Sequence, residues 1–152
     1  MYDYFVAAMI CPQCGAVSPA DSSTDMQTRL RDDARGIEIG VGFQFDPLEV
    51  RERDLESSGY LPVTLEHPVD QIQLLDTWTC PACHHTNWAR VTIDGTKIVA
   101  IEAVTLDRAT LAGAQFIAEG CYALAAQISG VPAADLLTHP EELVQILLSR
   151  LP

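Results

Sequence analysis

The stretch Thr79-Cys80-Pro81-Ala82-Cys83-His84-His85-Thr86-Asn87-Trp88 (TCPACHHTNW) carries two cysteines in a C-x-x-C spacing. Three kinds of chemistry use this spacing. Followed by histidine it is the string through which c-type haem is attached, with proline inside it is a redox-active pair, and it can be half of a four-cysteine metal site. The assignment of this stretch therefore decides how the chain is held together.

The redox and haem interpretations each lack a feature that they require. A redox pair lies at the N-terminus of a helix, whose dipole lowers the pKa of the first thiol, but the residues after Cys83 continue into a β-rich run. Haem attachment takes place outside the reducing cytoplasm, and the N-terminal MYDYFVAAMIC has no basic segment of the kind that opens a signal peptide. We expect a cytoplasmic protein, in which paired cysteines are more often metal ligands than disulfides.

A second C-P-x-C turn favours the metal interpretation. Cys11-Pro12-Gln13-Cys14-Gly15 has the same form and also follows a predicted strand. Each turn can direct two thiolates at one ion, and two turns complete a tetrahedral sulfur shell. Such a closed shell leaves no position for substrate or water, so the expected metal is structural. We predict that one Zn²⁺ is bound by four residues: Cys11, Cys14, Cys80 and Cys83.

With its paired C-P-x-C turns and flanking strands, the chain resembles a zinc ribbon, in which two such turns on two β-hairpins hold one structural zinc. We call residues 11–15 the first knuckle and residues 80–84 the second knuckle. Two departures stand out: the spacer between the knuckles is long, and His84 replaces the glycine. His84 or His85 could serve as a ligand, but four cysteines make this unnecessary, and we expect both histidines beside the metal or at the surface.

The rest of the chain predicts an α+β fold in one domain, residues 1–152, with antiparallel strands first and two helices packed on them afterwards. Hairpins are expected at 2–30 and 72–104, an insertion at 31–71, and a helical part at 105–152. Tyr2, Tyr4, Val6, Ala8 and Ile10 alternate as in a strand, and the clearest period-two pattern runs over residues 37–45.

Further local signals give the remaining elements. Residues 46–58 predict a surface helix with Asp46 as N-cap and Gly59 as stop, and a hairpin is expected to turn at Asp94-Gly95. One largely buried helix is expected over residues 106–128, with Cys121 as a small buried hydrophobe, and another from Pro140.

Composition bounds the function. The 152 residues carry 21 acidic and 9 basic side chains, a net charge of −12, which opposes general affinity for phosphate backbones. No apolar run is long enough to span a membrane, and none of the common catalytic motifs occurs. We therefore expect a non-enzymatic domain.

We hypothesise that it binds a basic protein partner, as an inhibitor or immunity protein that neutralises a toxic enzyme. The candidate surface comprises Glu49, Glu52, Asp54, Glu56, Tyr60, Asp70 and Asp76. The alternative is an accessory role in nucleic-acid machinery, which would use basic residues near the knuckles. These are Arg29, Arg31, Arg35, Arg90 and Lys97.

Overall fold

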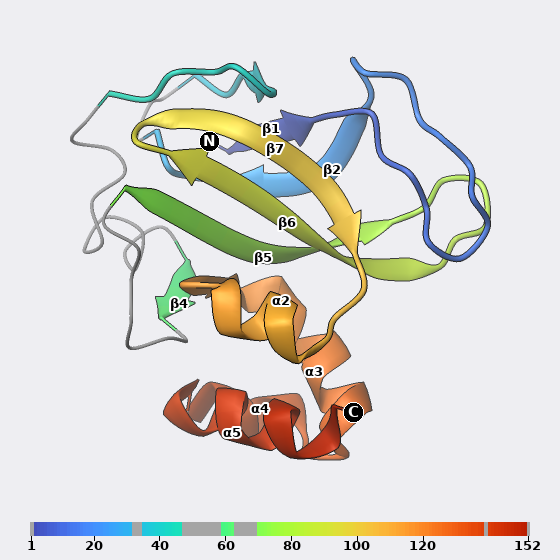
Figure 1. The fold of residues 1–152 in the computed structure, drawn as a ribbon, viewed down its shortest axis with the longest axis vertical. Helices are drawn as coiled ribbons and strands as arrows, with labels where there is room; N and C mark the ends of the chain where they lie inside the picture. Colours follow the sequence, from blue (N-terminus) through green and yellow to red (C-terminus); the bar gives the residue numbers. More distant parts are fainter. Residues whose placement is uncertain (1, 32–34, 47–58, 63–69, 139, 152) are drawn as a thin grey trace.

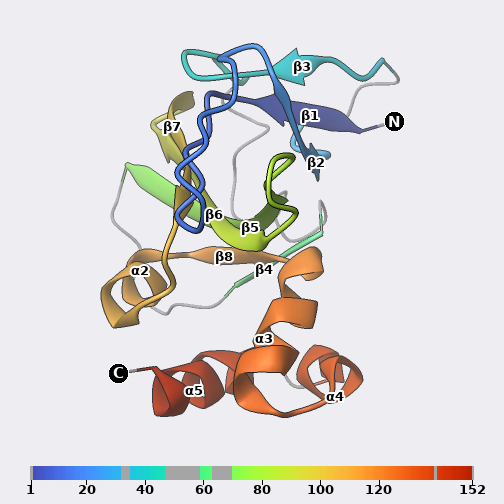
Figure 2. The same ribbon diagram turned by 90° about the vertical axis from the view of Figure 1, so that its right-hand side faces the viewer.

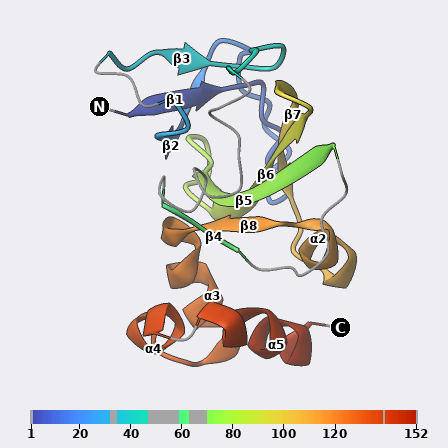
Figure 3. The same cartoon turned by 90° about the vertical axis from the view of Figure 1, so that its left-hand side faces the viewer.

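The computed structural model describes residues 2–31, 35–46, 59–62, 70–138 and 140–151. It has three layers: a small sheet, a larger sheet in the middle, and helices on the far side (Figures 1, 2 and 3). The predicted α+β class is confirmed. The elements are β1 (Asp3–Val6), β2 (Ser23–Thr28), β3 (Glu38–Ile39), β4 (Tyr60–Pro62), β5 (Gln71–Thr79), β6 (Thr86–Asp94), β7 (Lys97–Val104), α2 (Arg108–Gly113), β8 (Phe116–Ala118), η1 (Glu119–Cys121), α3 (Tyr122–Ser129), α4 (Ala133–Thr138) and α5 (Pro140–Arg150).

The small sheet has the strand order β2-β1-β3, with β1 antiparallel to β2 and parallel to β3. The alternation predicted for the first ten residues is present, but the regular strand ends at Val6. Phe5 and Met9 are fully buried, whereas Tyr2 and Ile10 are exposed. The buried face is therefore formed by the intervening residues, such as Phe5 and Met9. The residues whose alternation predicted the strand lie on the opposite face.

The period-two pattern over residues 37–45 forms a strand only at β3, so the prediction of a long strand here was wrong. The two glycines explain where it stops. A Cβ on Gly40 would lie 3.2 Å from the carbonyl oxygen of Val6, a close backbone approach that only glycine permits without a shift. Gly42 has φ +95°, which turns the chain out of the sheet and leaves Val41 exposed.

The middle sheet has the strand order β4-β8-β5-β6-β7. Its centre is the β5–β6 hairpin, which pairs without interruption from Gln71 and Asp94 at one end to Thr79 and Thr86 at the other. Successive residues of β5 face opposite layers. Leu74 belongs to the core against the small sheet, and Leu75 belongs to the core against the helices.

The single helix predicted over residues 106–128 was wrong, because the chain there forms α2, β8, η1 and α3 in succession. α2 begins after Asp107, whose carboxylate accepts the Thr110 N–H. The apolar pair Phe116-Ile117 then pairs antiparallel with β4 and parallel with β5. Burial on both faces of a central strand, one face per core, accounts for the continuous apolar run that suggested a buried helix.

The C-terminal helices cover the second face of the middle sheet (Figure 2). α3 ends at Gly130, with φ +73°, as its position after the apolar run indicates. α5 begins at Pro140, in agreement with the prediction. The helix predicted over 46–58 falls almost entirely outside the described residues. None of the described helices has the length and apolar character needed to cross a membrane.

Candidate metal centre

The first knuckle follows β1 and is closed by two backbone hydrogen bonds. The N–H of Gly15 donates to the carbonyl of Cys11 at 2.9 Å, and the N–H of Cys11 donates to the carbonyl of Ala16 at 3.0 Å. Gly15 has φ +76°, which only glycine adopts without strain. The segments that enter and leave this turn are joined by one isolated antiparallel bridge, between Ile10 and Val17.

The second knuckle closes in the same way. The N–H of His84 donates to the carbonyl of Cys80 at 2.8 Å, and the N–H of Cys80 donates to the carbonyl of His85 at 2.9 Å. His84 takes the place of Gly15 with φ +61°, an uncommon conformation for a residue with a side chain. Here the turn connects the last pair of a regular hairpin, Thr79 and Thr86.

The two knuckles meet at one side of the molecule (Figure 1). The sulfur of Cys11 lies 3.7 Å from that of Cys83, the sulfur of Cys14 lies 3.8 Å from that of Cys80, and all four sulfurs lie within 4.8 Å of one another. All are free thiols. Four zinc–sulfur bonds of about 2.3 Å in tetrahedral geometry would put the sulfurs about 3.8 Å apart. The cluster therefore has the dimensions of a single-ion site.

The two histidines after Cys83 lie outside this cluster. His84 and His85 are exposed, and in the described part of the chain the group that could hold an ion contains cysteines alone. Of the four cysteines, Cys11 and Cys80 are buried whereas Cys14 and Cys83 are exposed. An ion held here would have a sheltered side toward the core and an open side toward solvent.

The thiols influence one another's ionisation. Burial acts to raise the pKa of Cys11, but backbone N–H groups of Cys14 and Gln13 and the neighbouring thiols lower it to about 6. The pKa of Cys83 is instead raised to about 12: the His85 N–H lowers it, but burial and the other three thiols raise it by more. One thiolate therefore forms readily and further negative charge is resisted, which is the situation that a bound cation relieves.

Asn87 is a residue of the site that sequence reasoning did not select. Its side-chain amide donates to the sulfur of Cys11 at 3.6 Å and to the carbonyl of His85 at 3.2 Å. It is buried, and it alternates with Ala89 and Val91 on the face of β6 that points into the core. A polar residue at an inward position of an apolar strand is the signal that could have identified it.

The predicted partner surface is only partly described. Tyr60 is buried, exposing 2% of its surface, and its hydroxyl donates to the Thr28 hydroxyl at 2.9 Å. Asp76 is also buried, and Asp70 is exposed beside the hairpin turn. Tyr60 and Asp76 line one cleft together, to which Asp70 does not contribute. The other four residues lie outside the described parts: Glu49, Glu52, Asp54 and Glu56.

Most of the basic residues considered for nucleic-acid binding make intramolecular contacts. Arg31 pairs with the buried Asp3 at 2.9 Å, and Arg90 pairs with Glu102 at 2.7 Å. The guanidinium of Arg29 lies 4.1 Å from the centre of the Tyr2 ring. The remaining residues of that set are Arg35, whose carbonyl accepts from Arg31, and Lys97, which is exposed. Cys121 is fully buried, as predicted.

Comparison with known proteins gives no match: no family model, no curated protein and no solved structure is significantly similar to this chain. Within the described part of the chain, the four clustered cysteines form a group that could hold a metal ion.

Proposed function

We propose that the four clustered cysteines bind one Zn²⁺ per chain and that this ion is structural. The observation that carries the proposal is the pair of sulfur–sulfur distances, 3.7 and 3.8 Å, which match the edge of a tetrahedral zinc–thiolate site. Tetrahedral sulfur sites also suit iron, so metal analysis has to identify the ion.

A structural role follows from the composition of the shell. Four thiolates occupy every position of a tetrahedral ion, whereas a catalytic zinc keeps one position for water or substrate. The ion would join a turn near the N-terminus to the β5–β6 hairpin, 66 to 72 residues away in the chain. Its binding free energy would then contribute to folding.

The test is metal analysis of the purified protein and of two serine variants. We expect one zinc per chain in the wild type and its loss in Cys11→Ser and Cys80→Ser, together with a lower cooperative unfolding temperature. Cys121→Ser is the matched control, because this thiol lies in the second core and donates to the carbonyl of Leu75. Full metal content in Cys11→Ser would contradict the four-cysteine site.

We further propose that the domain is non-enzymatic and acts by binding a basic protein, as an inhibitor or immunity protein does. The net charge of −12 supports this, because opposite charge steers association and sets partner choice. The test is titration calorimetry with the products of neighbouring genes at low and high salt. A complex that weakens with salt is expected, and failure to bind any neighbouring product counts against the proposal.

The nucleic-acid alternative has less support, because Arg31 and Arg90, two of the basic side chains considered for this role, are held by carboxylates. A mobility shift with DNA or RNA at low salt would support the nucleic-acid alternative instead.

A further inference from the structure

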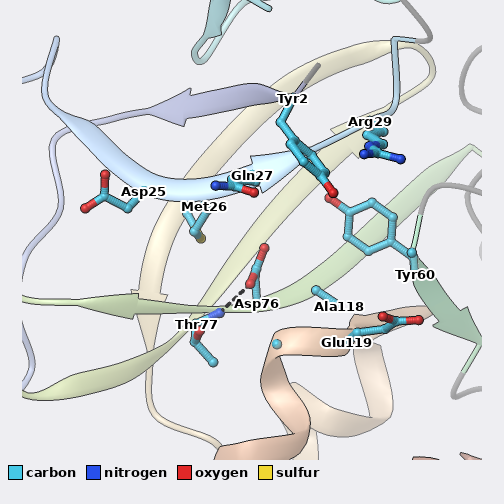
Figure 4. Close-up of a pocket in the computed structure, with 12 residues that line it drawn as sticks. Tyr2, Asp25, Met26, Gln27, Arg29, Tyr60, Asp76, Thr77, Ala118 and Glu119 are labelled. Atoms are coloured by element: carbon cyan, nitrogen blue, oxygen red, sulfur yellow. Dashed lines mark hydrogen bonds between the residues drawn. The ribbon is translucent and has the colours of Figure 1, made fainter.

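A cleft of about 530 Å³ lies between the small sheet and the middle sheet, where β2, β4, β5 and the start of η1 come together (Figure 4). None of the four clustered cysteines lines it. Its volume lies within the range of small-molecule sites. Its walls are formed by Tyr2, Asp25, Met26, Gln27, Arg29, Gly59, Tyr60, Asp76, Thr77, Ala118, Glu119 and Gly120.

Asp76 supplies a buried negative charge to this cleft. The residue exposes 8% of its surface, and its side chain points from β5 toward β2 (Figure 4). One carboxylate oxygen accepts the N–H of Thr77 at 2.8 Å. Within the described part of the chain this is the one hydrogen bond of the Asp76 carboxylate, and no lysine or arginine pairs with this carboxylate. A buried carboxylate without a cation lowers the free energy of unfolding, so the chain keeps a destabilising group at this point.

The ionisation of Asp76 reflects this environment. Burial raises its pKa to about 6, although the Thr77 N–H acts to lower it. The groups that face it are Tyr60 and Cys121, whose own pKa values are raised by burial and by the Asp76 charge. At neutral pH Asp76 is therefore mostly ionised while its neighbours remain neutral, and the cleft offers a carboxylate with a free oxygen.

The rim adds further negative charge. Two exposed acidic residues, Asp25 and Glu119, line the cleft. One basic residue lines it as well: Arg29, whose guanidinium lies over the Tyr2 ring. Asp25 has φ +60° and lies where the β1–β2 register is interrupted. Bulges of this kind re-aim a side chain and occur often beside functional sites, and a left-handed non-glycine residue is a strained one. The strain at Asp25 thus coincides with the cleft.

We propose that this cleft binds the guanidinium or ammonium group of a ligand, with the Asp76 carboxylate as its counter-ion and the Tyr60 ring as a wall. Tyr60 is suited to this because its hydroxyl is already engaged by Thr28, so the ring that lines the cleft stays neutral. The group can come from a free amine or from an arginine or lysine of a protein partner. The second source rests on the protein-binding function proposed above.

The first experiment uses two small probes of the same shape. Butylguanidinium is charged and butylurea is neutral, so the pair tests the role of charge without any mutation. Titrations of the wild type are followed through the backbone amide signals of Asp76, Thr77 and Met26 by NMR. We expect these signals to move with butylguanidinium and to remain in place with butylurea. Equal binding of both probes, or of neither, would overturn the proposal.

Two variants locate the counter-ion. Asp76→Asn keeps the shape of the side chain and is expected to weaken butylguanidinium binding at least tenfold. Asp94→Asn is the matched control, because Asp94 is an exposed carboxylate at the far end of β6 and does not line the cleft. It is expected to bind as the wild type does. Undiminished binding by Asp76→Asn would also overturn the proposal.

A peptide distinguishes the two sources of the cation. Acetyl-Gly-Arg-Gly-amide presents the same guanidinium on a backbone. Binding at least tenfold tighter than butylguanidinium supports a partner side chain, and equal or weaker binding supports a free amine. Zinc content and binding to neighbouring gene products are measured on the same preparation. Guanidinium binding by a protein that holds no zinc, or binds no partner, would separate this inference from the proposed function.

Discussion

The two knuckles have the same backbone hydrogen bonds but different support. The second knuckle closes a hairpin in which nine residues of β5 pair with nine of β6. The first knuckle is flanked by one isolated bridge and by Ser18, whose hydroxyl accepts the Met9 N–H at 2.8 Å. The second half of the site is therefore formed by local structure, whereas the first half depends on docking against it. A bound ion contributes most where local support is weakest.

The largest expected effect comes from removing the metal. Structural zinc binds with an apparent free energy on the order of 10 kcal/mol, most of which acts on folding. On chelation we expect the amide protons of Cys11 and Gly15 to lose protection from hydrogen exchange, while those of Cys80 and His84 keep more of theirs. NMR-detected exchange with and without a chelator measures this. Equal loss in both knuckles would show that they do not differ in support.

Asp76→Asn changes the β5–β6 hairpin without altering any of the four clustered cysteines. Because the pKa of Asp76 is raised from 3.8 to about 6, the folded protein retains this proton to higher pH than the unfolded chain does. The group is least unfavourable below pH 4, and stability falls as the pH rises toward 6. Above that the cost is on the order of 3 kcal/mol.

We therefore expect Asp76→Asn to stabilise the protein by up to about 3 kcal/mol at pH 7 and by little at pH 4. Urea denaturation at the two pH values measures this difference. In the metal-free protein the gain should appear in the exchange of second-knuckle amides and not in the first knuckle. A stabilisation that is independent of pH would mean that the buried charge is not its cause.

Asn87→Ala tests the bond that crosses from β6 to the first knuckle, because the Asn87 amide donates to the sulfur of Cys11. Partners of metal ligands typically contribute 10- to 100-fold in affinity, so a loss of about that size is expected. Competition with a chromophoric chelator gives the affinity. Thr86→Ala, a change at the exposed neighbouring residue, is the control and should bind metal normally.

The smallest effects come from exchanging the residues that follow the second cysteine of each knuckle. Gly15→Ala should cost about 1 kcal/mol through its positive φ alone, since a Cβ there would meet no atom within 4 Å. His84→Gly should stabilise by about the same amount, because it relieves a left-handed side-chain residue.

Thermal denaturation of the metal-bound protein measures both changes. Gly120→Ala serves as control: its Cβ also meets nothing, and its φ is not positive. Changes of the same sign in Gly15→Ala and His84→Gly would contradict the equivalence of the two turns.

Local signals predicted the two knuckles and the turn between β6 and β7. The C-P-x-C turns fix their own geometry, and Gly95 marks the turn between β6 and β7, so no knowledge of distant contacts was needed. The end of α3 at Gly130 is likewise set locally, by its left-handed φ. Where sequence neighbours determine the conformation, the pattern is sufficient.

The errors concern elements whose conformation depends on distant partners. β8 lies between β4 and β5, so its apolar residues are buried from both sides and show no alternation that would distinguish a strand from a helix. Asn87 and the cleft around Asp76 likewise depend on residues brought together from separate strands. The inward polar position of Asn87 is visible in the sequence, but its contact with Cys11, like the cleft, forms only once the two sheets are stacked.

The long spacer between the knuckles sets an order of events during synthesis. Cys14 leaves the ribosome 66 residues before Cys80, which at typical rates is a delay of roughly 3 to 13 seconds. Through this interval the nascent chain carries one cysteine pair that cannot enclose an ion by itself. An ion bound by all four cysteines would be enclosed only after the hairpin emerges, so metal supply would act on a late step in the maturation of the protein.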